Sequence, residues 1–188
     1  MMKLAFVFFF VLTSLSLWFG AQETPPAICR GKILPIGIMP GPEMTFVPVP
    51  LRFGGTRPPP VPWFHSFPTK TSFREVIKTR EQFSDFWKRL LAPVPPRKWP
   101  PMPEIDFAKE MVVVAAMGER PSSGYGIMID GACECDGQVE VYVSSNENAC
   151  SGGGLAVVTA PADAVKLPQT NLPIVFRETQ IPCPLRSK

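Results

Sequence analysis

The sequence contains little of the chemistry that most hydrolytic enzymes use. Its 188 residues include a single histidine, His65, and no Gly-x-Ser-x-Gly segment. A serine–histidine–carboxylate site needs a histidine beside its nucleophile, and His65 stands in a proline-rich stretch. A phosphate-binding loop is absent too, because no Gly-Lys-Ser/Thr follows the glycines at 152–154. We therefore expect no catalytic residues and no cofactor. A glycosidase that uses only carboxylates is an enzyme class that these absences do not exclude.

Charge is scarce and nearly balanced. Lys and Arg total 19 and Asp and Glu total 16, which gives a net charge of +3. No run or face of basic residues stands out, although nucleic-acid binding depends on such a concentration of positive charge. The composition therefore gives no indication of a nucleic-acid partner.

The first 21 residues have the pattern of a secretory signal peptide. Lys3 precedes an uncharged apolar block at residues 4–19, and Gly20 and Ala21 follow it. The block is short for a transmembrane helix, which needs about 20 apolar residues. Cleavage after Ala21 would place the bulky Phe19 in the recognition site, so an uncleaved anchor is the alternative. We expect an exported protein, periplasmic, cell-surface or extracellular, that contacts the membrane only through an uncleaved leader.

Export bears on the cysteines, which tend to pair in an oxidising compartment. Cys133 or Cys135 with Cys150 could join two neighbouring loops, and Cys29 with Cys183 could tie the two ends of the chain. There are five cysteines, so at least one thiol is left over. The spacing of Cys133 and Cys135 does not fit a zinc site, which usually has two to four residues between its paired cysteines. We expect disulfides and no metal site.

Proline divides the chain. The sequence has 24 prolines, concentrated at residues 25–68 and 93–103. Residues 22–68 form a proline-rich arm, in which extended polyproline geometry is expected. Isolated apolar residues along the arm favour docking on the domain or on a partner. The remaining chain is assigned to a domain at residues 69–180 and a tail at 181–188.

The domain combines one helix with several short strands. Residues 80–91 carry an apolar stripe with helical spacing, and Thr79 with Gln82 forms a capping-box pattern. Such a stripe usually packs in a core, here through Phe83, Phe86, Trp87, Leu90 and Leu91. Strands are expected at residues 73–77, 111–117, 125–129, 138–144, 155–159, 164–167 and 174–176. This pattern predicts an α+β fold with a mostly antiparallel sheet, curled into a small sandwich or barrel.

A turn between two expected strands is the candidate binding site. It reads Arg120, Pro121, Ser122, Ser123, Gly124 and Tyr125. Pro121 fixes one turn dihedral, and Gly124 permits a positive φ. Tyr125 follows directly, and an aromatic residue on a rigid turn is a good interface anchor. The alternative is that Tyr125 begins a strand and packs inward with its hydroxyl bonded locally.

Residues 104–125 resemble the C-terminal domain of the PrcB family, subunits of bacterial cell-surface protease complexes. The family pattern "DF…(K)xMVV…GxRPTGGY" corresponds to Asp106-Phe107, Met111-Val112-Val113 and Gly118 to Tyr125. The resemblance extends over residues 70–178. The family usually has Gly-Gly before the tyrosine, where this chain has Ser123-Gly124. The same loop is also distantly similar to the Asn-Pro-Thr-Thr-Gly-Tyr loop of chagasin-type cysteine protease inhibitors.

These resemblances imply an exported, non-catalytic binding module. It would be an accessory or stabilising subunit, or an inhibitor-like regulator, of an exported protease. Residues 120–125 would form the contact, with Tyr125 as anchor and Arg120 as a polar or charged contact. The alternative is a structural protein of the cell envelope that acts through its proline-rich arm and has no protease partner.

Overall fold

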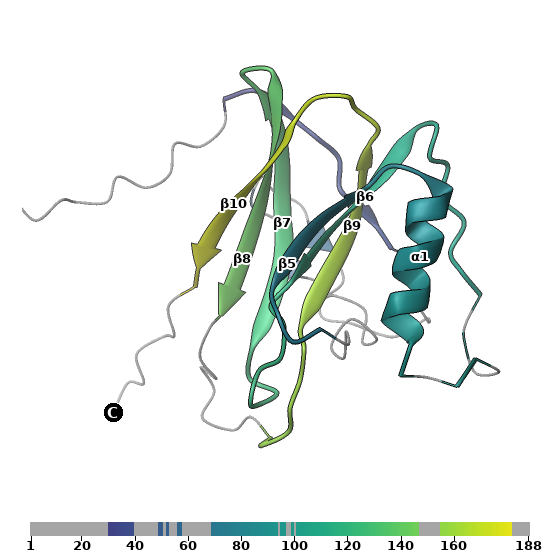
Figure 1. Ribbon diagram of the computed structural model, residues 1–188. Helices are drawn as coiled ribbons and strands as arrows, with labels where there is room; N and C mark the ends of the chain where they lie inside the picture. Colours follow the sequence, from purple (N-terminus) through teal and green to yellow (C-terminus); the bar gives the residue numbers. More distant parts are fainter. Residues whose placement is uncertain are drawn as a thin grey trace, which may run out of the picture.

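Two four-stranded β-sheets face each other, and one helix packs on the outer side of one of them (Figure 1). The computed structural model describes residues 30–39, 49–50, 52, 56–57, 69–93, 95–96, 99, 101–146 and 155–181. The expected α+β fold, with mostly antiparallel strands arranged as a small sandwich, is confirmed. None of the helices in these ranges is long and apolar enough to cross a membrane.

The first sheet has the order β1-β7-β8-β10 and the second has the order β2-β9-β6-β5. All neighbours are antiparallel except β8 and β10, which are parallel. A short antiparallel pair, β3 (Val49–Pro50) with β4 (Thr56–Arg57), stands apart. The strands of the two sheets are β1 (Lys32–Ile33), β2 (Gly37–Ile38), β5 (Phe73–Ile77), β6 (Glu110–Ala116), β7 (Gly126–Cys135), β8 (Gln138–Asn146), β9 (Ala162–Pro168) and β10 (Ile174–Gln180).

The helix α1 (Arg80–Leu91) begins and ends as the sequence predicts. The Gln82 amide donates to the Thr79 hydroxyl at 3.2 Å, and the Thr79 amide donates back to the Gln82 side chain at 3.2 Å. These two bonds satisfy amides that the first helical turn leaves unpaired. The whole apolar stripe is buried, so its expected role in the core is confirmed.

β6 separates two cores, because it is buried on both faces. Alternate residues of a strand point to opposite sides of its sheet. Val112 and Val114 pack against α1, whereas Met111 and Val113 pack between the two sheets. The continuous apolar run therefore has a direct structural reason, since each of its faces has a partner layer.

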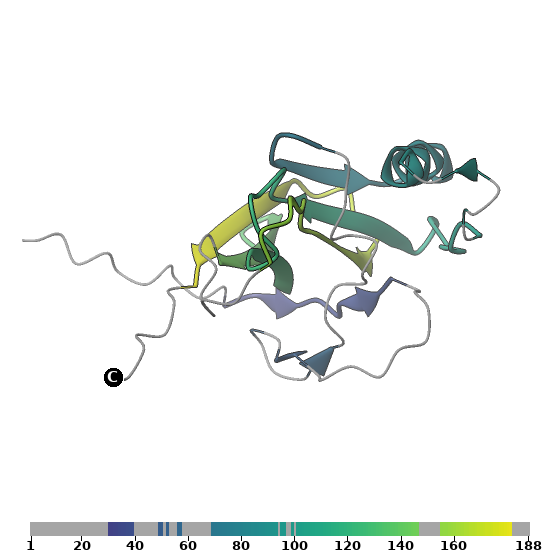
Figure 2. The same ribbon diagram turned by 90° about the horizontal axis from the view of Figure 1, so that it is seen from below.

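The beginning of the proline-rich arm is part of both sheets. β1 pairs with β7 and β2 pairs with β9, so residues 32–38 cross from one sheet to the other. Leu34, between them, is buried in the core between the sheets. In Figure 2 these purple strands lie on the side of the molecule opposite β5 and α1. Docking of the arm on the domain, the arrangement that its apolar residues favour, is thus seen at residues 30–39.

A second part of the arm reaches the outer face of the first sheet. The Arg52 amide donates to the Asp130 carbonyl at 2.8 Å, and its guanidinium pairs with the Asp130 carboxylate at 3.2 Å. The same guanidinium lies 4.9 Å from the centre of the Tyr142 ring. Tyr142 and Glu140 are buried although they point away from the core between the sheets. The strict alternation of β8 is therefore that of a strand with two buried faces.

The structure corrects one expected strand and lengthens four others, β7 to β10. Residues 155–159 were expected to form a strand, but they form an irregular segment with a single bridge between Thr159 and Arg120. The expected strand at 125–129 continues to Cys135 across a bulge between Ile129 and Gly131. The bulge hides the alternation on which a sequence prediction of this strand depends.

The cysteines that lie in the described ranges differ in state. Cys133 is buried and disulfide-bonded, whereas Cys135 is a free thiol. The candidates Cys29, Cys150 and Cys183 lie outside these ranges. The disulfide suggested for Cys135 is therefore wrong, whereas the pairings of Cys133 with Cys150 and of Cys29 with Cys183 stay predictions.

Candidate functional site

The candidate loop leaves β6 through a glycine in the left-handed conformation. Gly118 has φ +74°, and a Cβ atom there would lie 2.7 Å from the Lys70 carbonyl oxygen. Glycine is thus required twice, for its backbone angle and for the close approach of residue 70. Gly124 does not have a positive φ, so the expected use of glycine conformational freedom at that position is wrong. The reversal that needs it occurs six residues earlier, at the strand end.

Residues 155–159 brace the loop along its length. The amide of Arg120 donates to the Thr159 carbonyl at 2.7 Å, and the amide of Thr159 donates back at 2.9 Å. Further along, the Ser123 amide donates to the Leu155 carbonyl at 3.1 Å, and the Leu155 amide donates to the Ser123 hydroxyl at 2.9 Å. The Thr159 hydroxyl donates to the Ser122 carbonyl at 2.8 Å. The loop is therefore held by a second segment and has little freedom to rearrange.

The bracing segment presents apolar side chains to solvent. Leu155 is 73% exposed, Val158 is 67% exposed and Val157 is 48% exposed. Pro121 and Ser123 of the loop are exposed beside them. We call residues 120–125 and 155–159 together the paired-loop surface. Contiguous exposed apolar groups of this kind are typical of interaction sites.

Tyr125 combines the two roles that the sequence left open. It is half-buried and packs against the core between the sheets. The Arg120 guanidinium lies 6.0 Å from the centre of its ring. The side-chain nitrogen of Asn146, Nδ2, donates to the Gly124 carbonyl at 2.8 Å and fixes the backbone beside Tyr125. Tyr125 therefore joins the end of the loop to the core, and the Arg120 guanidinium lies near its ring.

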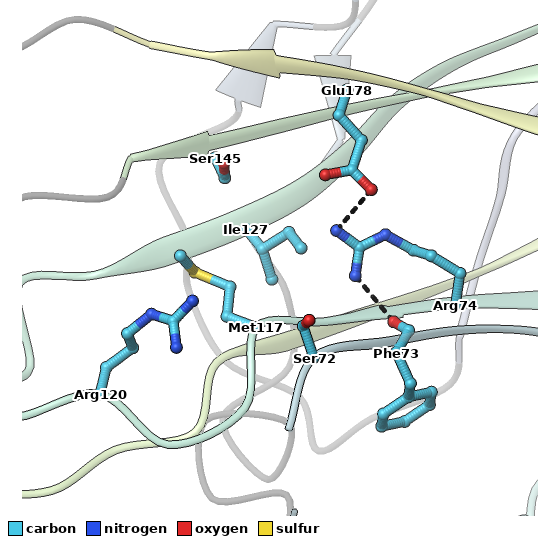
Figure 3. A pocket seen from close by; sticks show the side chains of 8 residues that line it. All are labelled: Ser72, Phe73, Arg74, Met117, Arg120, Ile127, Ser145 and Glu178. Carbon is cyan, nitrogen blue, oxygen red and sulfur yellow. Dashed lines mark hydrogen bonds and ion pairs between the residues drawn. The ribbon is translucent and has the colours of Figure 1, made fainter. Parts of the chain in front are cut away.

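Arg120 also lines a pocket that the sequence analysis missed. The pocket has a volume of about 230 Å³ and lies where β5 and β10, the two strands at the open edges of the sheets, come together (Figure 3). We call it the seam pocket. Its polar lining is Ser72, Arg74, Arg120, Ser145 and Glu178. Its apolar lining is Phe73, Met117 and Ile127.

An ion pair spans the seam at this pocket. The Arg74 Nη2 atom lies 2.9 Å from the Glu178 Oε1 atom, and its Nη1 atom donates to the carbonyls of Phe73 and Ala116 at 2.7 Å each (Figure 3). Arg74 is largely buried, with 19% of its side chain exposed. Lys78, the residue after β5, donates through its ammonium group to the carbonyl of Thr170, in the loop before β10, at 2.8 Å. The Arg74–Glu178 ion pair thus joins the two edge strands, which are not paired through their backbones.

The sequence therefore predicts only part of this site, namely the loop at residues 120–125. The structure brings Arg120 close to Arg74, Ser72, Ser145 and Glu178, which come from three other segments of the chain. No motif connects these residues, so a single sequence carries no signal for them. Among the residues placed by the structure, no cluster of His, Cys, Asp and Glu could hold a metal ion.

The fold and the braced loop define a small α+β sandwich module. Residues 111–168 match the family model described as PrcB C-terminal. The match begins in β6, includes the candidate loop, β7 and β8, and ends with β9. It confirms the resemblance to the PrcB C-terminal domain, over a narrower range than residues 70–178. Comparisons with curated proteins and with solved structures gave no match.

Proposed function

We propose that this chain is an exported, non-catalytic binding module that serves a protease as an accessory subunit or an inhibitor-like regulator. Its contact is the paired-loop surface, residues 120–125 and 155–159. The PrcB C-terminal match supports a protease-associated subunit and is consistent with an accessory role without catalysis. Export rests on the apolar leader at residues 1–21.

The braced and exposed loop is the observation that carries the proposal. Two backbone hydrogen bonds join Arg120 to Thr159, and two further bonds join Ser123 to Leu155. A surface held in one conformation loses little entropy when it binds. Its exposed Leu155 and Val158 offer apolar area that a partner can remove from water. Rigid backbone with exposed apolar side chains favours protein recognition.

The inhibitor-like form of the proposal differs in what the loop does. A subunit would use the paired-loop surface to hold the protease, whereas an inhibitor would insert residues 120–125 into the substrate cleft. A panel of papain-like proteases tests insertion directly. If micromolar protein leaves all of them fully active, the inhibitor-like form is abandoned and the subunit form is retained.

The alternative function, a stalk or wall contact made by the arm, has less support. Residues 32–38 are committed to the two sheets, and Arg52 is committed to Asp130 and Tyr142. Deleting residues 22–68 would remove four strands, β1 to β4, and with them Leu34 and Met39, which are buried in the two cores. Such a deletion therefore tests folding, and point variants on the surface are needed instead.

A cross-linked pull-down from the native envelope tests the proposal with Val158→Asp. Val158 is 67% exposed, so a charge there should leave the fold intact but oppose burial against a partner. Ile33→Asp is the matched control, because Ile33 is 55% exposed and lies on β1. Its partner in β7, Cys133, is seven residues beyond Gly126, about 23 Å at 3.3 Å per residue.

We expect a protease to be recovered with the wild type and with Ile33→Asp, and to be lost with Val158→Asp. Equal recovery of a protease with all three proteins would remove the paired-loop surface from the proposal. Recovery of cell-wall material without a protease would favour the arm as the functional part.

A further inference from the structure

The seam pocket has an excess of positive charge. Two guanidinium groups, from Arg74 and Arg120, line it against one carboxylate, from Glu178. Glu178 already pairs with Arg74 at 2.9 Å. Arg120 makes no ion pair with any residue in the described ranges; its Nη1 atom donates to the Glu119 carbonyl at 3.0 Å. One guanidinium at the pocket is therefore available to an anionic group.

The rest of the lining suits a carboxylate attached to a short carbon chain. Met117 is 3% exposed and Ile127 is 5% exposed, and these two side chains give the pocket a small apolar floor that the methylene groups of an acidic side chain can contact. Ser72 and Ser145 add hydroxyl groups that can donate to a second carboxylate oxygen. Figure 3 shows Arg120 and Arg74 on opposite sides of Met117 and Ile127.

The size of the pocket limits the ligand. Its volume of about 230 Å³ is below the roughly 300–1,000 Å³ of ordinary small-molecule sites. A single side chain or a chain terminus fits such a space, whereas a cofactor or a nucleotide does not.

The paired-loop surface continues from the pocket. Arg120 lines the pocket and is bonded through its backbone to Thr159, next to the exposed Val157 and Val158. Arg120 is therefore common to the pocket and to the paired-loop surface. This arrangement is complementary to an acidic residue with apolar neighbours.

We propose that the seam pocket binds a carboxylate of an extended protein segment, with an apolar residue of that segment lying on Leu155, Val157 and Val158. The proposal deepens the function proposed above and rests on it for the identity of the partner as a protein. Arg120 is the specificity-determining residue, and Arg74 is a positioning residue because Glu178 and two carbonyls already hold it.

Short peptides test the pocket without a protease. The full chain, labelled with ¹⁵N, is titrated with acetyl-Leu-Glu-Leu-amide and followed by amide chemical shifts. Acetyl-Leu-Gln-Leu-amide is the matched uncharged probe, and acetyl-Leu-Gln-Leu with a free carboxyl terminus tests the other source of the carboxylate. We expect millimolar binding of a charged peptide, with shifts at Ser72, Arg120 and Ser145.

Arg120→Gln should weaken that binding at least about tenfold, since a hydrogen bond to a charged group is lost. Arg80→Gln is the control, because Arg80 is an exposed arginine at the start of α1. The amide spectrum of each variant reports whether it is folded. If Arg120→Gln does not fold, binding of the charged peptide to the wild type is measured at increasing sodium chloride concentrations instead. We expect the added salt to weaken this binding.

Each result decides the proposal. Binding of the glutamate peptide or of the free-terminus peptide supports it and identifies the source of the carboxylate. Equal binding of the charged and uncharged peptides, or no shift with any peptide at about 10 mM, overturns it. These outcomes are separate from the pull-down, because a protease can be captured through the apolar residues alone.

Discussion

Replacing Glu140 by glutamine should destabilise the domain by about 1.5 to 3 kcal/mol, the range for hydrogen bonds to charged groups. Glu140 is 6% exposed, and its Oε1 atom accepts from the Arg177 Nε atom at 3.0 Å. Its Oε2 atom accepts from the Tyr142 hydroxyl at 2.7 Å. Glutamine keeps the shape but replaces one acceptor by an NH₂ group, so one of these donors loses its partner.

The exposure of Arg177 limits the loss. Half of its side chain, 49%, is exposed, so water can solvate the guanidinium when the carboxylate is removed. Water cannot solvate the Tyr142 hydroxyl in the same way, because Tyr142 is only 2% exposed. The expected cost is therefore below the roughly 3–5 kcal/mol of breaking a fully buried ion pair.

Urea denaturation at pH 7 measures the effect, with Asp85→Asn as a matched control. Asp85 also pairs with a basic residue, Lys88, at 3.2 Å, but their side chains are 74% and 62% exposed. Such an exposed pair contributes about 0–1 kcal/mol. If Glu140→Gln costs no more than Asp85→Asn, the argument from burial is refuted.

The same variant has a defined pH dependence. Hydrogen bonds from Arg177 and then from Tyr142 lower the pKa of Glu140 below its ordinary value in the folded protein. A carboxyl group whose pKa is lowered on folding stabilises the protein above its unfolded pKa, and this contribution is lost as the pH falls through the folded pKa. The difference in stability between the wild type and Glu140→Gln should therefore shrink as the pH is lowered from 7 to about 2. A difference that stays constant over this range would contradict the role of the charge.

Three further predictions concern the strand end, the thiols and the helix. Gly118→Ala should destabilise the domain by about 1 to 3 kcal/mol in a urea titration, and by more than Gly137→Ala. Both glycines have φ +74°, but of the two only Gly118 has backbone atoms within 3 Å of an added Cβ atom. Equal losses of stability in the two variants would show that this clash has no effect. Iodoacetamide without a reductant should modify Cys135 and not Cys133, as read by peptide mass spectrometry, and slowly at pH 8, because desolvation and then Glu140 raise the pKa of the Cys135 thiol; rapid labelling at pH 8 would contradict this. Phe86→Ala should cost about 3–5 kcal/mol of unfolding free energy, since Phe86 is fully buried on the face of α1 that packs in the core. A loss under about 1 kcal/mol would show that the helix is not needed for the core.

The parts of the fold with local signals could be predicted from the sequence. The apolar stripe and capping residues of α1 are specified within 13 residues, and the structure places the helix at the same bounds. The double burial of β6 follows from its unbroken apolar run. The valines of β8 indicate its inward face, although the same alternation suggests that Glu140 and Tyr142 face solvent. Arg52 lies over Tyr142, and nothing near β8 in the sequence indicates that contact.

The remaining features depend on contacts between distant segments. Residues 155–159 have the composition of a strand, yet they bond to a loop and form a single β-bridge, between Thr159 and Arg120, so tertiary context overrides their propensity. Residues 32–38 are short and rich in proline and glycine neighbours, and they become strands only because the edges of β7 and β9 are open to them. Local propensity is weak evidence wherever a neighbouring edge decides the conformation.

The seam pocket follows from the same logic, since it exists because the sandwich is left open on one side. The arm links the sheets across the β1 and β2 side, whereas β5 and β10 meet on the other side without a backbone ladder. An open edge has unpaired backbone groups and invites association with other chains. Here Arg74 satisfies the Phe73 and Ala116 carbonyls and holds Glu178 across the gap, which leaves Arg120 as the group that a partner can engage. The Arg74–Glu178 ion pair thus closes this edge in the isolated domain, and Arg120 beside it is the residue that we propose selects a carboxylate.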